Sequence, residues 1–289
     1  MLVSLKEILD IAEEKKIAIG SFNTPDLTSL QAVIAAAEEL DLPVIVQFAQ
    51  CHEVDNKYNV LEDIGPIMVD FAKRASVPVC AHLDHGEDLE YLKKALKMGF
   101  TGIMYDGSVL PYEENLENTK KAVAMAAKYG ASVEAELGSM GKRENGDGDG
   151  SEDDTKIYTD AVLAGEFVKA TGIHALACSF GTTHGLYLTK PRLDFSVVEN
   201  VRKETGGIPV VMHGGSGVSE EDFGKSIAAG VRKVNYFTYM DKAAGEALVN
   251  YIKEVNEAGT PVFFAEPAVR ARKAMKENVI GAMKVFAGL

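Results

Sequence analysis

Three histidines and one aspartate are the residues of this chain whose types and surroundings most clearly suggest chemistry. His85 directly follows Asp84 at the end of an apolar run. His184 lies in a Gly-Thr-Thr-His-Gly stretch, and His213 precedes Gly-Gly-Ser-Gly. Three neutral imidazoles with one open coordination position are typical of a catalytic zinc site, although histidine also binds other divalent metals such as cobalt. We therefore predict that the three histidines hold one metal ion and that Asp84 transfers protons beside it.

The residues around Asp84 leave alternatives open. His82 lies two residues before Asp84, so both side chains point to the same side of a strand. We interpret His82 as a hydrogen-bond partner in the shell around the metal ligands. Asp84 itself could instead be a fourth ligand, or a helix N-cap, since Glu87 follows at the spacing of a capping box.

Acidic residues after two later apolar runs are further candidates. Asp106 and Glu136 could support the ligands, form an alternative metal position, or serve the structure alone. Glu134 lies on the same face as Glu136 and could support it. Two other histidines are interpreted as structural, because His52 falls in a polar loop and His174 comes just before an apolar run.

Apolar runs alternate with amphipathic segments along the whole chain. The runs predict strands at 17–22, 43–48, 78–83, 101–105, 132–137, 175–178, 208–212 and 231–235. Helical spacing predicts helices at about 26–40, 64–75, 87–98, 113–129, 161–170, 240–256 and 266–286. This alternation favours an α/β fold, a (β/α)8 TIM barrel with an additional C-terminal helix, as one domain over 1–289. An open doubly wound sheet is the alternative.

The barrel prediction places the chemistry at one end of the molecule. Active sites of such barrels lie at the carboxyl ends of the strands. Six successive predicted strands, the third to the eighth, end in or are followed by polar candidates: Asp84 and His85, Asp106, Glu136, His184, His213 and Asn235. We therefore expect these side chains to meet at one mouth.

Composition limits the classes of partner. The formal net charge of −13 argues against nucleic acid, whereas backbone N–H groups can still bind a small phosphorylated substrate locally. No apolar run approaches the roughly 18–20 residues of a membrane span, and the first residues do not resemble a signal peptide. Three cysteines without paired spacing predict free thiols and a cytoplasmic protein.

The glycine-rich turn after His213 is a candidate phosphate site. Gly214, Gly215 and Ser216 precede a helix expected to start near Ser219. Backbone N–H groups of such a turn, together with the Ser216 hydroxyl, could hold a phosphate. Barrels often bind phosphate after their seventh and eighth strands. Gly185 and Asn235 are expected to complete this site.

A long polar stretch at 138–154 is expected to be a mobile lid or a solvated acidic loop. As a lid it would carry Glu144 to the substrate. Its Asn and Asp spacing also matches the first half of a calcium-binding EF-hand loop, but Lys156 occupies the position of the required glutamate.

Several stretches together resemble the class II, metal-dependent ketose-bisphosphate aldolases, which include fructose-bisphosphate and tagatose-bisphosphate aldolases. The resemblance runs along most of the chain and is carried by residues 20–23, 82–86, 103–108, 133–138, 181–187, 213–217 and 233–235. It implies that His85, His184 and His213 hold a catalytic Zn2+ and that Asp84 is the acid/base.

The same resemblance implies a substrate and an assembly. Reversible retro-aldol cleavage of a ketose phosphate would give dihydroxyacetone phosphate and an aldehyde. Asn23, Gly185, Gly214 to Ser216, and Asn235 would bind the substrate and its phosphate, and Glu144 would exchange a proton on the loop. The family often uses a monovalent cation (Na+ or K+) near that phosphate. It usually forms dimers or larger assemblies, which implies a homodimer or homotetramer.

Three positions depart from the family pattern. Leu188 follows Tyr187 where many members have lysine, although Lys190 lies close by. Ala49 replaces an expected serine, and Phe237 stands in an acidic position. Losing charged and polar partners weakens phosphate binding, so a non-standard ketose is one alternative.

Three further possibilities concern substrate and function. Arg270 and Arg272 could reach a far phosphate or face solvent. A metal-dependent sugar-phosphate isomerase or epimerase could use similar chemistry, and a non-catalytic barrel is a third reading.

Overall fold

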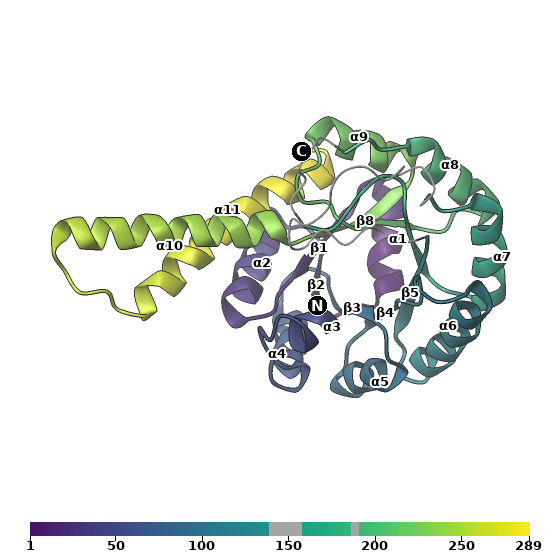
Figure 1. The fold of residues 1–289 in the computed structure, drawn as a ribbon, viewed down its shortest axis with the longest axis horizontal. Coiled ribbons are helices and arrows are strands. Elements are labelled where there is room, and N and C mark those ends of the chain that lie inside the picture. Colours follow the sequence, from purple (N-terminus) through teal and green to yellow (C-terminus); the bar gives the residue numbers. More distant parts are fainter. Residues whose placement is uncertain (139–157, 186–190) are drawn as a thin grey trace.

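Eight parallel strands close into a barrel within the described part of the chain. The structure is a computed structural model that describes residues 1–138, 158–185 and 191–289. The strands pair in sequence order and β1 pairs with β8, which closes the barrel (Figure 1). Their bounds are β1 Ile19–Asn23, β2 Val44–Ala49, β3 Val79–Gly86, β4 Gly102–Tyr105, β5 Ser132–Leu137, β6 Ala175–Cys178, β7 Val210–Met212 and β8 Val231–Tyr236. The predicted (β/α)8 TIM barrel is confirmed, and the open sheet is excluded.

Helices surround the strands and cover their outward side chains (Figure 1). The ring consists of α2 Leu27–Leu40, α4 Leu61–Arg74, α5 Leu89–Met98, α6 Tyr112–Ala127, α7 Ala161–Thr171, α8 Phe195–Glu204, α9 Glu220–Ala229 and part of α11 Ala265–Ala287. A short helix, α3 Gln50–Val54, directly follows β2. The predicted C-terminal helix is α11. Its first half runs beside α10, Thr238–Ala258, in an arm that projects from the barrel (Figure 1).

A helix that the apolar pattern did not reveal closes the amino end of the barrel. Helix α1, Leu5–Lys15, begins with a capping box in which Ser4 and Glu7 bond each other's backbone N–H groups. Leu5, Ile8, Leu9 and Ala12 share one face at helical spacing, and all are buried. This face packs inside the barrel against inward strand residues such as Ile19, Ile45 and Met104.

Residue alternation along each strand separates an inner from an outer layer. On β5, Val133 and Ala135 point outward into the main core. Glu134 and Glu136 lie on the opposite face, and both are buried inside the barrel. The carboxyl half of the interior therefore receives polar side chains, and it contains the predicted site.

A helix that crosses a bilayer must be long and apolar. Within residues 1–138, 158–185 and 191–289, no helix is long and apolar enough to do so.

Candidate metal and acid/base site

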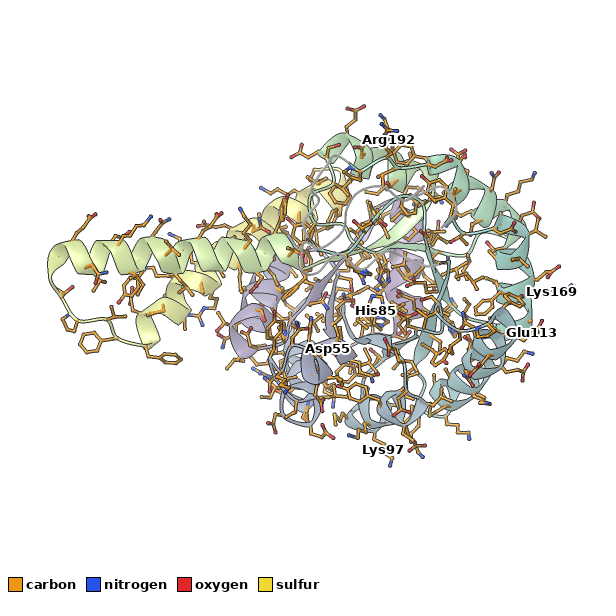
Figure 2. The ribbon with its side chains drawn as sticks, viewed as in Figure 1. Asp55, His85, Lys97, Glu113, Lys169 and Arg192 are labelled. Atoms are coloured by element: carbon orange, nitrogen blue, oxygen red, sulfur yellow. The ribbon has the colours of Figure 1, made fainter. Side chains whose placement is uncertain are left out.

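A local irregularity in β3 turns His85 into the mouth. The β3–β4 register shifts between Leu83 and Gly86, and His85 has a φ of 43°, in the left-handed region. Regular alternation would direct His85 away from the face that carries His82 and Asp84. The bulge instead lets Asp84 and His85 both reach the site. Figure 2 places His85 inside the ring of helices, while Lys97 and Lys169 lie at the outer surface.

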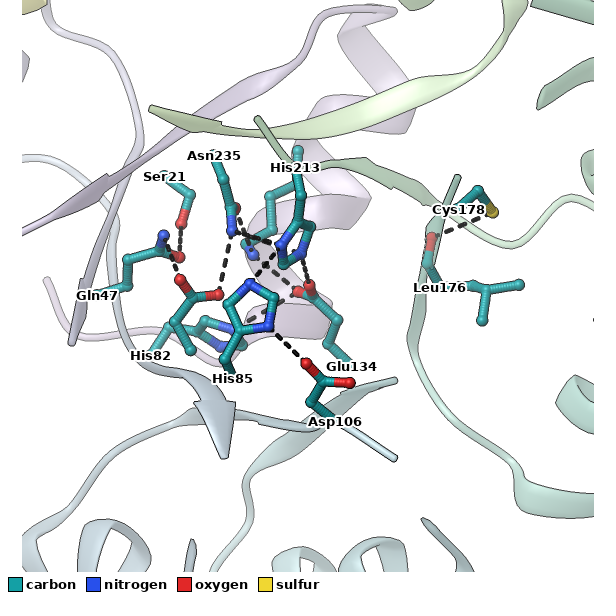
Figure 3. Close-up of polar contacts among 12 residues, drawn as sticks. Ser21, Gln47, His82, His85, Asp106, Glu134, Leu176, Cys178, His213 and Asn235 are labelled. Atoms are coloured by element: carbon teal, nitrogen blue, oxygen red, sulfur yellow. Dashed lines mark hydrogen bonds and ion pairs between the residues drawn. The ribbon is translucent and has the colours of Figure 1, made fainter. Parts of the chain in front are cut away.

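Each ligand candidate offers one ring nitrogen to a common point. His85 Nδ1 lies 2.7 Å from Asp106 Oδ2, which leaves His85 Nε2 facing inward (Figure 3). His213 Nε2 lies 2.9 Å from Glu134 Oε1, and His213 Nδ1 lies 2.8 Å from His85 Nε2. His184 Nε2 is buried and has no hydrogen-bond partner among the described residues.

This donor set fits a divalent metal. One atom from each of His85, His184 and His213 lies within 4.8 Å of the others. Asp106 and Glu134 each bond the ring nitrogen of His85 or His213 that faces away from the common point. Such carboxylates usually fix the tautomer of a metal-binding histidine. The buried, unpaired nitrogen of His184 is explained if a metal accepts its lone pair. A three-histidine set with an open position suits zinc.

Glycine lets two loops meet behind this cluster. Gly214 has a φ of 65°, and an added Cβ there would lie 2.3 Å from the carbonyl oxygen of Thr183. Any larger residue would push apart the segments that carry His184 and His213. The glycine after His213 is therefore needed for the geometry of the ligands, whatever it contributes to phosphate binding.

Charges around His85 favour its protonated form before a metal binds. Burial opposes the charged ring, but the carboxylates of Asp84 and Asp106 outweigh burial and raise the pKa of His85 to about 10. Burial, with the charges of His85 and His213, lowers the pKa of His184 to about 3. Burial and His85 also lower the pKa of His213, against the opposing effect of Glu134. A metal cation would replace the positive charge that His85 carries.

Asp84 is held by three side-chain amides. Asn235 Nδ2 donates to Asp84 Oδ1 at 3.1 Å, whereas Gln47 Nε2 and Asn23 Nδ2 donate to Oδ2 at 3.0 and 3.3 Å. Burial alone would raise the pKa of Asp84, but the positive charges of His85, His213 and Lys233 hold it well below its usual range. Asp84 is thus an oriented carboxylate.

The alternative of Asp84 as a helix N-cap is wrong. Asp84 belongs to β3, and helix α5 begins later with Asp88 as its N-cap. The β3–β4 irregularity extends the strand to Gly86, which leaves Asp84 inside the barrel.

Two residues that help to hold Asp84 were missed from the sequence. Gln47 on β2 bonds Asp84 and also donates to Asn23 Oδ1 at 2.7 Å. Ser21 on β1 donates to Gln47 Oε1. The available signal was a polar residue at an inward position of an otherwise apolar strand.

Asp106 and Glu136 lie on the other side of His85. One ligand atom from each of the three lies within 4.8 Å of the others, so they form a second possible metal cluster. Burial opposes the charge of Asp106, but His85 and Ser108 hold its pKa low. Burial and the charge of Asp106 raise the pKa of Glu136 well above its usual value.

Glu134 and His82 occupy the layer beneath the ligands. Glu134 contacts His213 and Lys233, whereas its predicted role was to support Glu136. His82 Nε2 lies 3.5 Å from Glu134 Oε2. Burial and the charge of Lys233 lower the pKa of His82 to about 3, so the ring is neutral. The prediction that His82 and Asp84 share a face agrees with their common position inside the barrel.

The predicted phosphate residues surround the end of β7. Gly215 N–H donates to the carbonyl oxygen of Asn235 at 3.1 Å, which joins the turn to β8. The Ser216 hydroxyl accepts from the Phe237 N–H at 3.3 Å. Gly185 follows His184 directly with a φ of 88°. Helix α9 starts here with Ser219 as its N-cap and three acidic residues in its first turn. A phosphate would therefore be held by the turn, because those acidic side chains repel an anion at the helix start.

Other candidates lie apart from the cluster or outside the described residues. Glu144, Leu188 and Lys190, like the calcium-like stretch, fall outside the described residues. Arg272 donates to Gln31 on α2. Arg270 pairs with acidic residues of α10 and α11.

Two histidines interpreted as structural have different surroundings. His174 Nδ1 accepts from the Val133 N–H at 3.0 Å, which is a structural contact. His52 does not lie in a polar loop. It is buried on α3, where its ring packs against those of Phe48, Tyr58 and Phe237.

Comparisons with known proteins give one consistent family. Residues 3–288 match the family model "Fructose-bisphosphate aldolase class-II". The chain is 37% identical over 287 residues to the fructose-bisphosphate aldolase of Staphylococcus aureus strain Mu50, covering 99% of this chain and 97% of the relative. It is 38% identical over 294 residues to the probable fructose-bisphosphate aldolase of Bacillus subtilis strain 168, with the same coverage.

Solved structures extend the same similarity. The crystal structure of the YdjI aldolase from Escherichia coli K12 has a TM-score of 0.84 and 35% identity, covering 99% of this chain and 97% of that one. A putative fructose-1,6-bisphosphate aldolase from Coccidioides immitis has a TM-score of 0.81 and 29% identity, covering 98% and 95%.

Proposed function

The chain belongs to the class-II fructose-bisphosphate aldolase family, and we propose that it is a zinc-dependent aldolase of the cytoplasm. The chain is a lyase of the aldolase type. Its proposed reaction is the reversible retro-aldol cleavage of a ketose phosphate or bisphosphate, of the fructose 1,6-bisphosphate or tagatose 1,6-bisphosphate type. The products would be dihydroxyacetone phosphate and an aldehyde. One observation carries the proposal: three imidazoles from separate strand ends converge beside an oriented carboxylate.

The metal and the chain have separate roles in the proposed mechanism. His85, His184 and His213 would hold the zinc, which would supply Lewis acidity to the ketose carbonyl and to the negative charge that develops during cleavage. Asp84 accepts the proton of the C4 hydroxyl as the bond between C3 and C4 breaks. In condensation it returns that proton to the aldehyde oxygen. Glu144 is proposed to exchange the proton on C3 of the dihydroxyacetone phosphate half.

The amides around Asp84 keep its carboxylate in one orientation. Gln47 bonds both Asp84 and Asn23, so a change in one amide is transmitted to the others. Asn23 and Asn235 are also proposed to contact a substrate hydroxyl beside Asp84. This arrangement reduces the reorganisation needed when the proton moves.

The phosphate end is proposed to lie at the turn after β7. Gly214, Gly215 and Ser216 would bind the phosphate of the dihydroxyacetone phosphate half, with Gly185 and Asn235 beside them. The turn is built from backbone and hydroxyl groups, whose N–H and O–H donors can bind phosphate. The predicted monovalent cation and homodimer or homotetramer rest on the resemblance and stay predictions.

Altered positions on the phosphate side support a non-standard substrate as an alternative. Ala49 and Phe237 are apolar where the family has polar groups, and Phe237 packs on His52 at a ring-centroid distance of 5.3 Å. These positions offer fewer charge-assisted bonds to a phosphate. The alternative that these changes favour is an aldolase for a non-standard ketose.

A substrate panel tests the proposal. Zinc-loaded protein would be assayed for dihydroxyacetone phosphate release from fructose 1,6-bisphosphate, tagatose 1,6-bisphosphate and several ketose 1-phosphates. We expect cleavage of at least one, loss of activity after dialysis against a chelator, and recovery when zinc is returned. Undiminished turnover by the metal-free protein would contradict the metal role. A product with an unbroken carbon chain would instead identify an isomerase or epimerase.

A further inference from the structure

Lys233 is a fully buried cation in the centre of the barrel. It lies on β8 two residues before Asn235, and its side chain is 0% exposed. Both side chains point into the barrel, because residues two apart share one face of a strand. A buried ammonium group is costly unless it is paired and hydrogen-bonded. The proposed acid/base and metal roles do not use Lys233 directly.

The first contact of Lys233 sets the orientation of Asn235. Lys233 Nζ donates to Asn235 Oδ1 at 2.8 Å. An ammonium group can only donate, so the oxygen of the Asn235 amide must face Lys233. The NH2 group of the same amide then faces Asp84, to which it donates at 3.1 Å. Without Lys233, the amide could rotate and present its oxygen to the Asp84 carboxylate.

The second contact sets the state of Glu134. Lys233 Nζ forms an ion pair with Glu134 Oε2 at 2.8 Å. Glu134 Oε1 lies 2.9 Å from His213 Nε2. A carboxylate accepts hydrogen bonds, so His213 Nε2 carries the proton and the lone pair lies on Nδ1. That nitrogen is the one that faces His85 and the proposed metal.

We propose that Lys233 is a positioning residue that orients the metal ligand His213 and the acid/base Asp84 together. It does so through Glu134 on one side and Asn235 on the other. The inference rests on the proposed metal-dependent function and extends it to a residue that touches neither substrate nor metal. If Lys233 only neutralised the charge of Glu134, its removal would leave the orientations of Asn235 and Asp84 unaffected.

Replacing Lys233 with methionine tests the metal side of this role. Methionine keeps an unbranched chain and removes the charge. Zinc affinity of the metal-free protein would be measured by competition with a coloured chelator. We expect a 10- to 100-fold loss, on the order found when partners of metal ligands are removed. The visible spectrum of the Co2+-substituted protein should also change, because the orientation of His213 changes.

A double-mutant cycle tests the Asp84 side. The kcat at saturating zinc and substrate would be measured for Lys233→Met, Asn235→Ala and the double variant. If Lys233 acts through Asn235, the double variant should lose about as much as Asn235→Ala alone. If the fold-losses of kcat in the two single variants multiply in the double variant, the proposal is overturned. Unchanged zinc affinity in Lys233→Met would also overturn it.

Two further variants separate positioning from a failure to fold. Lys233→Met combined with Glu134→Gln removes the uncompensated carboxylate and should recover the stability of the metal-free protein. We expect the kcat of this double variant at saturating zinc to stay at least tenfold below the wild-type value. Recovery to the wild-type value would show that Lys233 only balances the charge of Glu134. Lys225→Met, which changes an exposed lysine of α9, is the matched control and should change nothing.

The wild-type measurements separate this inference from the proposed function. Wild-type protein that binds neither zinc nor Co2+ would contradict the metal-dependent function itself. Normal metal binding by both wild-type and Lys233→Met would leave that function intact and reject the role of Lys233.

Discussion

The two ends of the barrel use the same strand positions for opposite purposes. At the amino end, Ile19, Ile45 and Cys80 point inward and pack against helix α1. Toward the carboxyl end, Ser21, Gln47 and His82 occupy the next inward positions, two residues further along the same strands. In each of the first three strands, the inward side chain is therefore apolar at one position and polar at the next inward position, two residues later.

The difference separates stability from chemistry within one interior. The amino end excludes polar groups and gains free energy from packing. The carboxyl end buries carboxylates, imidazoles and a lysine, which cost free energy unless each is paired. Substitutions at the two ends should therefore have different signatures: lost stability with normal turnover at the amino end, and lost turnover or metal binding at the carboxyl end.

The largest effect is expected from Asp84→Asn. The change removes the proposed acid/base and keeps a side chain of the same size. We expect kcat to fall by about 10²- to 10⁴-fold, the usual contribution of general acid–base catalysis. Steady-state retro-aldol assays with zinc-loaded protein would measure it. Zinc content should be unchanged, and Asp63→Asn, an exposed carboxylate of α4, serves as control. Turnover within twofold of wild type would remove Asp84 from the mechanism.

The next effect concerns stability at the other end. Leu9 on α1 is 1% exposed and packs inside the barrel. Leu9→Ala should lower the free energy of unfolding by about 2–5 kcal/mol, as other buried leucine truncations do. Urea denaturation would measure the loss, and kcat should stay near wild type. Val109→Ala, at a side chain that is 78% exposed, should change stability by less than about 0.5 kcal/mol. A large fall in kcat for Leu9→Ala would mean that the two ends are coupled.

A smaller and pH-dependent effect is expected from Glu13 at the end of α1. Glu13 pairs with Arg202 of α8, and with Arg232 of β8 at 3.1 Å. Burial opposes its charge, but the two arginines lower the pKa of Glu13. Glu13→Gln should cost about 1–3 kcal/mol near pH 7, between the values for exposed and buried pairs.

The sign of the pH dependence follows from that lowered pKa. A carboxylate with a lowered folded pKa stabilises the protein above its unfolded pKa, near about 4.3. This contribution is lost as the pH falls through the folded value. Unfolding free energies of wild type and Glu13→Gln should therefore converge below about pH 4. A difference that stays constant down to pH 3 would show that packing, and not charge, holds α1 at this position.

The sequence was informative where periodicity and residue type act locally. Apolar runs located the eight strands, and counting them identified the barrel. The three histidines were found because their types and strand-end positions agree with one metal. Helix α1 was missed, because its local sequence does not show what its apolar face would cover. The inward residues that it covers come from strands far along the chain.

Other parts of the site depend on distances that no sequence pattern supplies. The left-handed conformation of His85 breaks the alternation from which side-chain direction is predicted. Glu134 was predicted to support Glu136 because the two share a face of the strand. Its partners are instead His213, after β7, and Lys233, on β8. The polar residues around His52 predicted a loop. In the structure its ring is covered by Phe48, which is close in sequence, and by Phe237, which lies far along the chain.

The amide cradle of Asp84 has a consequence for robustness. Asn23, Gln47 and Asn235 hold the carboxylate through groups that neither gain nor lose protons across the pH range in which proteins stay folded. The direction in which Asp84 points is therefore insensitive to acidity, unlike the histidine cluster beside it. An enzyme built in this way would keep its proposed base aimed while metal occupancy varies, so we expect it to recover activity at once when metal is returned.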